Sequence, residues 1–228
     1  MRSMSARFTN YKDVIDHLPP ASVLVLEDVT WEEYESLLED LAEHRRSVRV
    51  TYDRGRLELV TTSRKHEKFN RFIEGMIRIL SEEYAMNIES SGQATWKRKH
   101  LAKGAESDSA FHIAAAGDVI GKEELNLDHD PPPDLAIEID VSNQSLGKLP
   151  IYSAFSVPEI WRYLPRKNVL QIYVLRESAY IDAESSRAFP ILTRIGRVPA
   201  EKCKARPNTG ARRFSAIAAP ATQVRMKG

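Results

Sequence analysis

The chain has 228 residues, 42% of them hydrophobic, which is enough to bury one core and predicts a single α/β or α+β domain. A formal net charge of +1 excludes a uniformly basic surface, so any contact with nucleic acid would have to come from local patches. The chain has no apolar run of about 18 residues, no apolar leader and a single cysteine, Cys203. These features argue against a membrane partner, export and a disulfide framework, and we expect a cytoplasmic protein.

The first half of the chain begins with an expected N-terminal extension over residues 1–29, in which periodicity is weak. Thr30 and Glu33 form a capping box, and apolar residues at helical spacing follow it. A helix is therefore predicted from Thr30 to about residue 44. Alternating apolar residues on either side of a turn then predict a β-hairpin over residues 48–60.

The strongest helical pattern covers residues 65–84, and a strand is predicted over residues 88–96. A basic run, residues 97–100, follows that strand, and a short strand is predicted over residues 108–113. The helix carries one apolar stripe, which is typical of a face packed on a core: Phe69, Phe72, Ile73, Met76, Ile77 and Leu80.

The second half of the chain predicts a strand over residues 134–141, a short helix starting near Lys148, and an antiparallel strand pair over residues 159–164 and 168–175. From residue 182 onward ten Lys or Arg face only three acidic residues, and apolar periodicity is poor. We expect residues 191–228 to be a basic, weakly ordered tail rather than a dedicated nucleic-acid arm.

The predicted strand over residues 134–141 carries acids on one face and aliphatic side chains on the other, because successive side chains alternate. Asp134, Glu138 and Asp140 share a face that contains no Lys or Arg, so their charges repel one another. A divalent metal together with Lys148 is the natural compensation. The alternative is a solvated acidic edge strand.

Five segments of the sequence resemble, in order, the Uma2 family of the PD-(D/E)XK nuclease superfamily. They are residues 55–59 with His66 and Glu67, then residues 104–113, 132–140, 149–152 and 157–163. The resemblance covers about residues 30–190, which it implies to be one nuclease domain. The implied fold is α/β, with a restriction-endonuclease-like core in which helices flank a central mixed β-sheet, and with an added N-terminal helix and hairpin.

The resemblance implies a metal-dependent endonuclease that hydrolyses DNA phosphodiester bonds, with Asp108 and Glu138 as ligands for Mg²⁺ or Mn²⁺. Hard carboxylate oxygens suit these ions, and both acids lie on the faces that alternation assigns as non-aliphatic. The superfamily lysine normally lies two residues after the second acid, where this chain has Asp140. Lys148 is the candidate for a migrated equivalent, and Asp140 for an outer-sphere ligand or an ion-pair partner of Lys148.

The first core helix offers two more candidates. By position, Glu67 matches an acid that the superfamily often adds. At about 100° per residue, however, His66 lies nearer the apolar stripe and so nearer the sheet. A capping bond is the alternative role for His66.

The expected partner is double-stranded DNA, and a homodimer is plausible because cutting two strands needs two sites. Residues 97–99 are the favoured phosphate-binding patch. The competing hypothesis is a nuclease-fold module that binds nucleic acid or protein without cutting, since the residues flanking Asp108 depart from the family pattern. The other basic candidates for phosphate contacts are Arg64, Lys65, Lys68 and Arg162.

Overall fold

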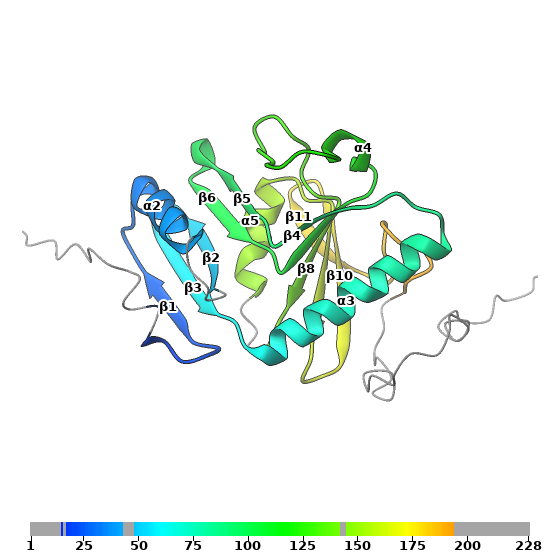
Figure 1. Cartoon of the computed structure of the whole chain (residues 1–228), viewed down its shortest axis with the longest axis horizontal. Coiled ribbons are helices and arrows are strands. Elements are labelled where there is room, and N and C mark those ends of the chain that lie inside the picture. The colour runs from blue at the N-terminus through cyan, green and yellow to red at the C-terminus, as the bar shows by residue number, and fades with distance from the viewer. Residues whose placement is uncertain (1–14, 16, 43–47, 142–144, 194–228) are drawn as a thin grey trace, which may run out of the picture.

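The computed structural model describes residues 15, 17–42, 48–141 and 145–193, which are organised around two β-sheets (Figure 1). The first sheet is antiparallel, and α2 (Trp31–Ala42) packs against it. The hydrophobic cluster between helix and sheet contains Trp31, Tyr34 and Leu37 from the helix and Val50, Leu57 and Leu59 from the strands. The strand order is β1 (Val23–Leu26), β3 (Arg56–Thr61), β2 (Val48–Asp53), β6 (Lys103–Glu106) and β5 (Thr95–Arg98).

The second sheet is mixed, because β8 and β9 are parallel while its other neighbouring strands are antiparallel. α3 (Arg64–Glu83) contributes to the hydrophobic cluster on one face of this sheet, and α5 (Leu149–Ala154) to the cluster on the other. The strand order is β11 (Ala179–Ala183), β10 (Val169–Arg176), β9 (Glu159–Leu164), β8 (Leu135–Ile139), β7 (Ser109–His112) and β4 (Glu89–Gly92).

The alternation in β8 decides which side chains meet which helix. Leu135, Ile137 and Ile139 belong to the cluster with α3, while Ala136 belongs to the cluster with α5. Glu138 therefore shares the α5 side of the sheet with Ala136. The whole strand is buried, so its acidic face is covered and is not a solvated edge.

The two sheets meet where the chain leaves β6 and enters β7. Only Ser107 and Asp108 separate these strands, although β6 belongs to the first sheet and β7 to the second. Both residues are buried. A residue at this crossing can be reached by side chains from either sheet, which is how the candidate site is assembled.

The predicted fold class is confirmed, since helices flank a mixed sheet that a helix and a hairpin precede. The hairpin, however, is built into a five-stranded sheet. The predicted strand over residues 88–96 divides into β4 and β5, which join different sheets, and Gly92, the last residue of β4, has a positive φ of 54°. β1 lies within the expected extension and pairs with β3.

Some expectations fall beyond the described ranges. Residues 194–228 of the expected tail lie outside them, as do residues 1–14 and 16 of the expected N-terminal extension and residues 43–44 at the end of the first helix. Within the described ranges, no helix combines the length and apolar character needed to cross a bilayer. The remaining short elements are α4 (Ala116–Val119) and the 3-10 helices η1 (Lys99–Leu101) and η2 (Ser145–Lys148).

Candidate active site

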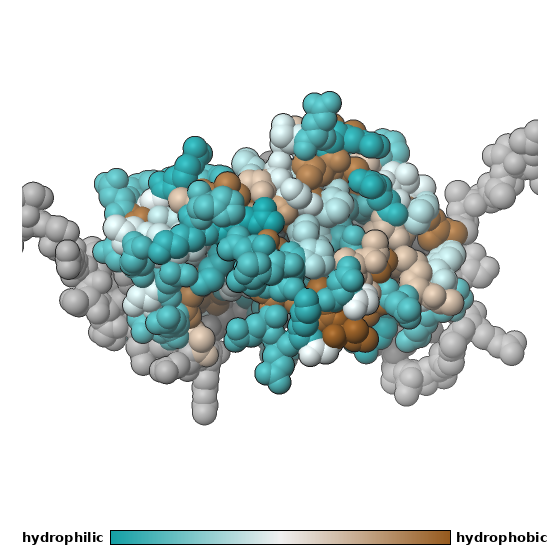
Figure 2. Space-filling model, turned by 90° about the horizontal axis from the view of Figure 1, so that it is seen from above, coloured by the Kyte–Doolittle hydropathy of each residue, from teal (hydrophilic) through white to brown (hydrophobic). Residues whose placement is uncertain are grey.

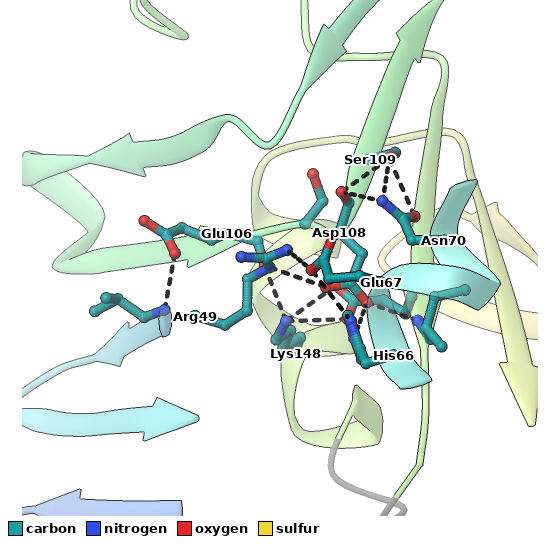
Figure 3. A network of polar contacts seen from close by, with 12 residues as sticks. Arg49, His66, Glu67, Asn70, Glu106, Asp108, Ser109 and Lys148 are labelled. Atoms are coloured by element: carbon teal, nitrogen blue, oxygen red, sulfur yellow. Dashed lines mark hydrogen bonds and ion pairs between the residues drawn. The ribbon is translucent and has the colours of Figure 1, made fainter. Parts of the chain in front are cut away.

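A pocket lies at the seam between the two sheets, and its walls come from both (Figure 3). Strands β2 and β3 and the start of α3 supply one part of the lining, and the ends of β8 and η2 supply another. Five of the six predicted site residues line it, together with an arginine that the sequence did not single out: Arg49, His66, Asp108, Glu138, Asp140 and Lys148.

Asp108 is at the centre of the polar network. Its Oδ1 accepts a hydrogen bond from Nε of Arg49 at 2.9 Å, and its Oδ2 lies 3.0 Å from Nε2 of His66. The same Oδ2 accepts the backbone N–H of Ile139 at 2.7 Å, which ties Asp108 to β8. Burial alone would raise the pKa of Asp108, but the hydrogen bond and charge of His66, with the charges of Lys148 and Arg49, lower it to about 2. Asp108 is therefore a carboxylate at neutral pH.

Glu138 and Lys148 form a buried ion pair that lines the same pocket. The Lys148 Nζ lies 3.0 Å from Oε2 of Glu138 and also donates to the Glu106 carbonyl at 2.8 Å. The Tyr152 hydroxyl, on α5, donates to Oε1 of Glu138. Burial raises the pKa of Glu138, while the Glu138 carboxylate holds the pKa of Lys148 above its usual value despite burial.

His66 and Glu67 both reach the site from the first turn of α3. The Ser63 side chain caps this helix by accepting the N–H of His66, so the capping interaction uses the His66 backbone and leaves its ring free to bind Asp108. Glu67 lies with its Oε1 3.5 Å from Nη2 of Arg49 and 3.7 Å from Nδ1 of His66. Arg49 thus bridges Asp108 and Glu67.

Asp140 lines the same pocket but is held by a different cation. Nε of Arg162 donates to its Oδ2 at 2.8 Å, and both residues are buried. Lys148 pairs with Glu138, so the expected ion pair of Asp140 with Lys148 is replaced by one with Arg162. Asp134 lies outside the pocket lining and accepts the N–H groups of Ile113 and Ala115.

Three residues that contribute to the site were not predicted as site residues from the sequence. Arg49 lies 59 positions from Asp108, and only the pairing of the sheets brings them together. Tyr152 was visible only as a member of a motif. Asn70, on α3, donates from Nδ2 to the Asp108 carbonyl at 3.1 Å and to Oγ of Ser109 at 3.0 Å, so it fixes the backbone on which Asp108 is carried.

The donor chemistry of the pocket fits a hard divalent cation. Oδ1 of Asp108 accepts from Arg49 and Oε2 of Glu138 from Lys148, and a carboxylate oxygen has a second lone pair to offer. In the part of the chain that the structure describes, no group of three or more His, Cys, Asp or Glu forms a ready-made cage. Mg²⁺ commonly uses one or two carboxylates and completes its coordination with water and substrate phosphate, so two acids suffice.

In the basic run that was favoured as a phosphate patch, both lysines pair with nearby acids. Lys97 pairs with Glu35 and Lys99 with Glu32, so acids on α2 balance both lysines. Arg98 instead donates from Nη2 to the Leu127 carbonyl at 2.8 Å. Arg162, a further candidate, is buried against Asp140.

Comparison with known proteins places the chain in a family. The sequence profile of the Uma2 family, described as "Putative restriction endonuclease", matches residues 31–194. The chain is also similar to a crystal structure described as "a putative nuclease belonging to DUF820" from Anabaena variabilis, with 14% sequence identity and a TM-score of 0.47. That similarity covers 69% of this chain and 87% of the other. None of the curated proteins compared with the chain matches it.

Proposed function

The chain belongs to the Uma2 family of restriction-endonuclease-like nucleases, and from that premise we propose that it hydrolyses phosphodiester bonds of double-stranded DNA with the help of Mg²⁺ or Mn²⁺. The observation that carries the proposal is the convergence of two buried carboxylates, Asp108 and Glu138, and the Lys148 ammonium around one pocket. Phosphodiester hydrolysis asks for this combination, since negative charge develops on the phosphate as water attacks.

Asp108 and Glu138 are the residues that would hold the metal. When bound, the ion supplies Lewis-acid activation of the phosphate and lowers the pKa of a bound water. Lys148 provides a fixed positive charge beside Glu138, and it stabilises charge that builds up on a phosphate oxygen or on the attacking water. Because Lys148 is also anchored to the Glu106 carbonyl, its position depends little on the substrate.

The remaining candidates act through these three residues. His66 holds Oδ2 of Asp108 and so orients the first carboxylate. Glu67 steadies Arg49, which holds the other oxygen of Asp108. Asp140, fixed by Arg162, contributes negative charge to the pocket wall and serves as an outer-sphere group.

The test combines metal binding with cleavage. Calorimetric titration with Mn²⁺ should give heat of binding for the wild type and lose it in Glu138→Gln and Asp108→Asn. Both variants should lose Mg²⁺-dependent cleavage of plasmid DNA, whereas Glu35→Gln, at a half-buried acid on α2 outside the pocket lining, should keep it. Retained cleavage in either site variant would contradict the ligand assignment. A homodimer, if it forms on DNA, would appear in sedimentation as two chains on one duplex.

A second function is favoured by one specific observation. The chain's own cations already pair with both carboxylates, Asp108 with Arg49 and Glu138 with Lys148. A site balanced in this way is also compatible with a module that binds nucleic acid without cutting it. The two functions differ in one result: the module would bind DNA yet bind no Mn²⁺ at the pocket, even in the presence of the duplex.

A further inference from the structure

The outward face of α3 carries a stripe of basic side chains, and we infer that this stripe holds the phosphate backbone of duplex DNA beside the pocket. We define the α3 stripe as Arg64, Lys68, Arg71 and Arg78. The inference rests on the proposed function and deepens it, because it names the surface that receives the DNA flanking the cut. It moves the expected phosphate contact away from residues 97–99.

The stripe follows from the helical repeat. Spacings of four, three and seven residues bring these side chains to one face. The buried side chains of α3, which include Ile73 and Ile77, lie on a different side of the helix, against the second sheet. All four basic residues are exposed. Figure 1 shows α3 lying across one face of that sheet, with no helix or strand of the described ranges over its outward side.

Glu82 and Glu83, in the last turn of α3, are exposed, and Glu82 lies four residues after Arg78 on the same face, so acids of the helix offset only the C-terminal end of the stripe. Around Arg64, Lys68 and Arg71 the positive charge is not balanced by the helix, because Glu67 is turned toward Arg49 and His66 and Glu74 accepts from Oγ of Ser109. Arg64 with Lys68, and Lys68 with Arg71, are like-charged neighbours that each destabilise a helix by about 0.2–0.5 kcal/mol. An anionic partner would remove that penalty.

The dimensions of the stripe suit a duplex. From Arg64 to Arg78 the helix rises about 21 Å, at about 1.5 Å per residue. The same length of B-DNA contains about six base pairs, at about 3.4 Å each. The stripe starts beside Ser63 and His66, which line the pocket, so it leads directly away from the proposed cutting position. The face of the molecule seen from above in Figure 2, at a right angle to the view of α3 in Figure 1, is largely hydrophilic, with apolar residues in small separate patches.

The loss-of-contact experiment measures binding of a 20-base-pair DNA duplex by fluorescence anisotropy, in EDTA, over a series of salt concentrations. Lys68→Gln with Arg71→Gln should weaken binding and make the slope of log K against log[salt] shallower by about 1.8. The matched control is Lys97→Gln with Lys99→Gln, which removes the same charge from the two lysines that pair with acids on α2. This control should leave the slope unchanged.

A gain-of-contact variant guards against misfolding as an explanation. Gly75 lies within the stripe, midway between Arg71 and Arg78, and an added Cβ there would meet no atom within 4 Å. Gly75→Lys should therefore tighten binding and steepen the salt slope by about 0.9, while Gly75→Gln should not.

The inference would be overturned if the salt slope changed equally in the α3 double variant and in the Lys97/Lys99 control. It would also be overturned if Gly75→Lys did not bind the duplex more tightly than the wild type. A wild type that does not bind the duplex but binds anionic phospholipid vesicles would overturn it as well. Because EDTA removes the metal, the binding result is independent of cleavage. Binding that depends on α3 without any cleavage in Mg²⁺ would disprove the proposed nuclease activity alone. Cleavage without any dependence on α3 would disprove the inference alone.

Discussion

Arg49 and Asp108 join the two sheets at the site: Nε of Arg49, on β2, lies 2.9 Å from Oδ1 of Asp108, at the crossing from β6 to β7. Their exposed side-chain fractions are 4% and 2%, so the pair is shielded from water. Arg49 also reaches Glu67 on α3, which links a third element to the same point. The pocket therefore exists only when both sheets are assembled.

Replacing Arg49 should destabilise the fold strongly. Arg49→Gln leaves Asp108 buried with less compensating charge, and removing one partner of a buried ion pair typically costs about 3–5 kcal/mol. His66 and the Ile139 N–H still hold Asp108, so we expect a value near the lower end, about 3 kcal/mol, by urea denaturation. The control is Arg56→Gln, whose pair with Glu27 is exposed and should be worth less than about 1 kcal/mol. Equal losses in the two variants would contradict the bridging role of Arg49.

Acid should weaken the fold through Asp108. Its pKa is about 2 in the folded chain, below the ordinary 3.8, so the folded state binds its proton less readily than the unfolded state. The resulting stability is fully present above pH 3.8 and is lost as pH falls through about 2. The difference in unfolding free energy between wild type and Asp108→Asn should shrink by roughly 2 kcal/mol over that range. A difference that stays constant from pH 5 to pH 2 would mean that the carboxylate is not stabilised by its cations.

Replacing two glycines, Gly104 and Gly75, by alanine should change the stability of the fold in opposite directions. A Cβ at Gly104, on β6, would lie 2.1 Å from the hydroxyl oxygen of Tyr34, whose ring is buried and stacked on Tyr52. Gly104→Ala should therefore destabilise by about 3 kcal/mol through overpacking. Gly75→Ala, in open space on α3, should stabilise by about 1 kcal/mol because alanine favours a helix. Thermal unfolding of the two variants checks both signs, and a stable Gly104→Ala would show that Tyr34 can move aside.

Regular periodicity made most of the fold predictable. α3, β8 and the β9–β10 pair all carry strong apolar patterns and were predicted close to their observed ranges. β6 was missed because Lys103–Glu106 has no alternating apolar residues, and the strand is held by its pairing with β2 and β5. A strand defined by its neighbours leaves little trace in its own sequence.

The sequence predicted those site residues that lie in or next to recognisable motifs, and it did not predict the others. Four residues predicted from motifs or from their neighbourhood do line one pocket: His66, Asp108, Glu138 and Lys148. Arg49 could not be found, since its role depends on how two separately patterned sheets meet. Of the two roles expected for Asp140, the ion pair with Lys148 is not the one formed: Asp140 pairs with Arg162, which lies on β9 directly beside β8, where Glu138 and Arg162 are in register.

Substitutions of Glu138 and Lys148 should have coupled effects on the free energy of unfolding, whereas removing Lys148 should abolish cleavage whether or not Glu138 is also replaced. Lys148→Met leaves Glu138 buried without its cation and should destabilise by about 3 kcal/mol in urea denaturation. Adding Glu138→Gln removes the stranded charge, so the double variant should recover most of that loss and be more stable than the sum of the single variants predicts. Neither Lys148→Met nor the double variant should cleave DNA in Mg²⁺, because the Lys148 charge beside the scissile phosphate is absent from both. Additive losses of stability would mean that the two side chains are not coupled, and cleavage by the refolded, stable double variant would remove Lys148 from the proposed mechanism.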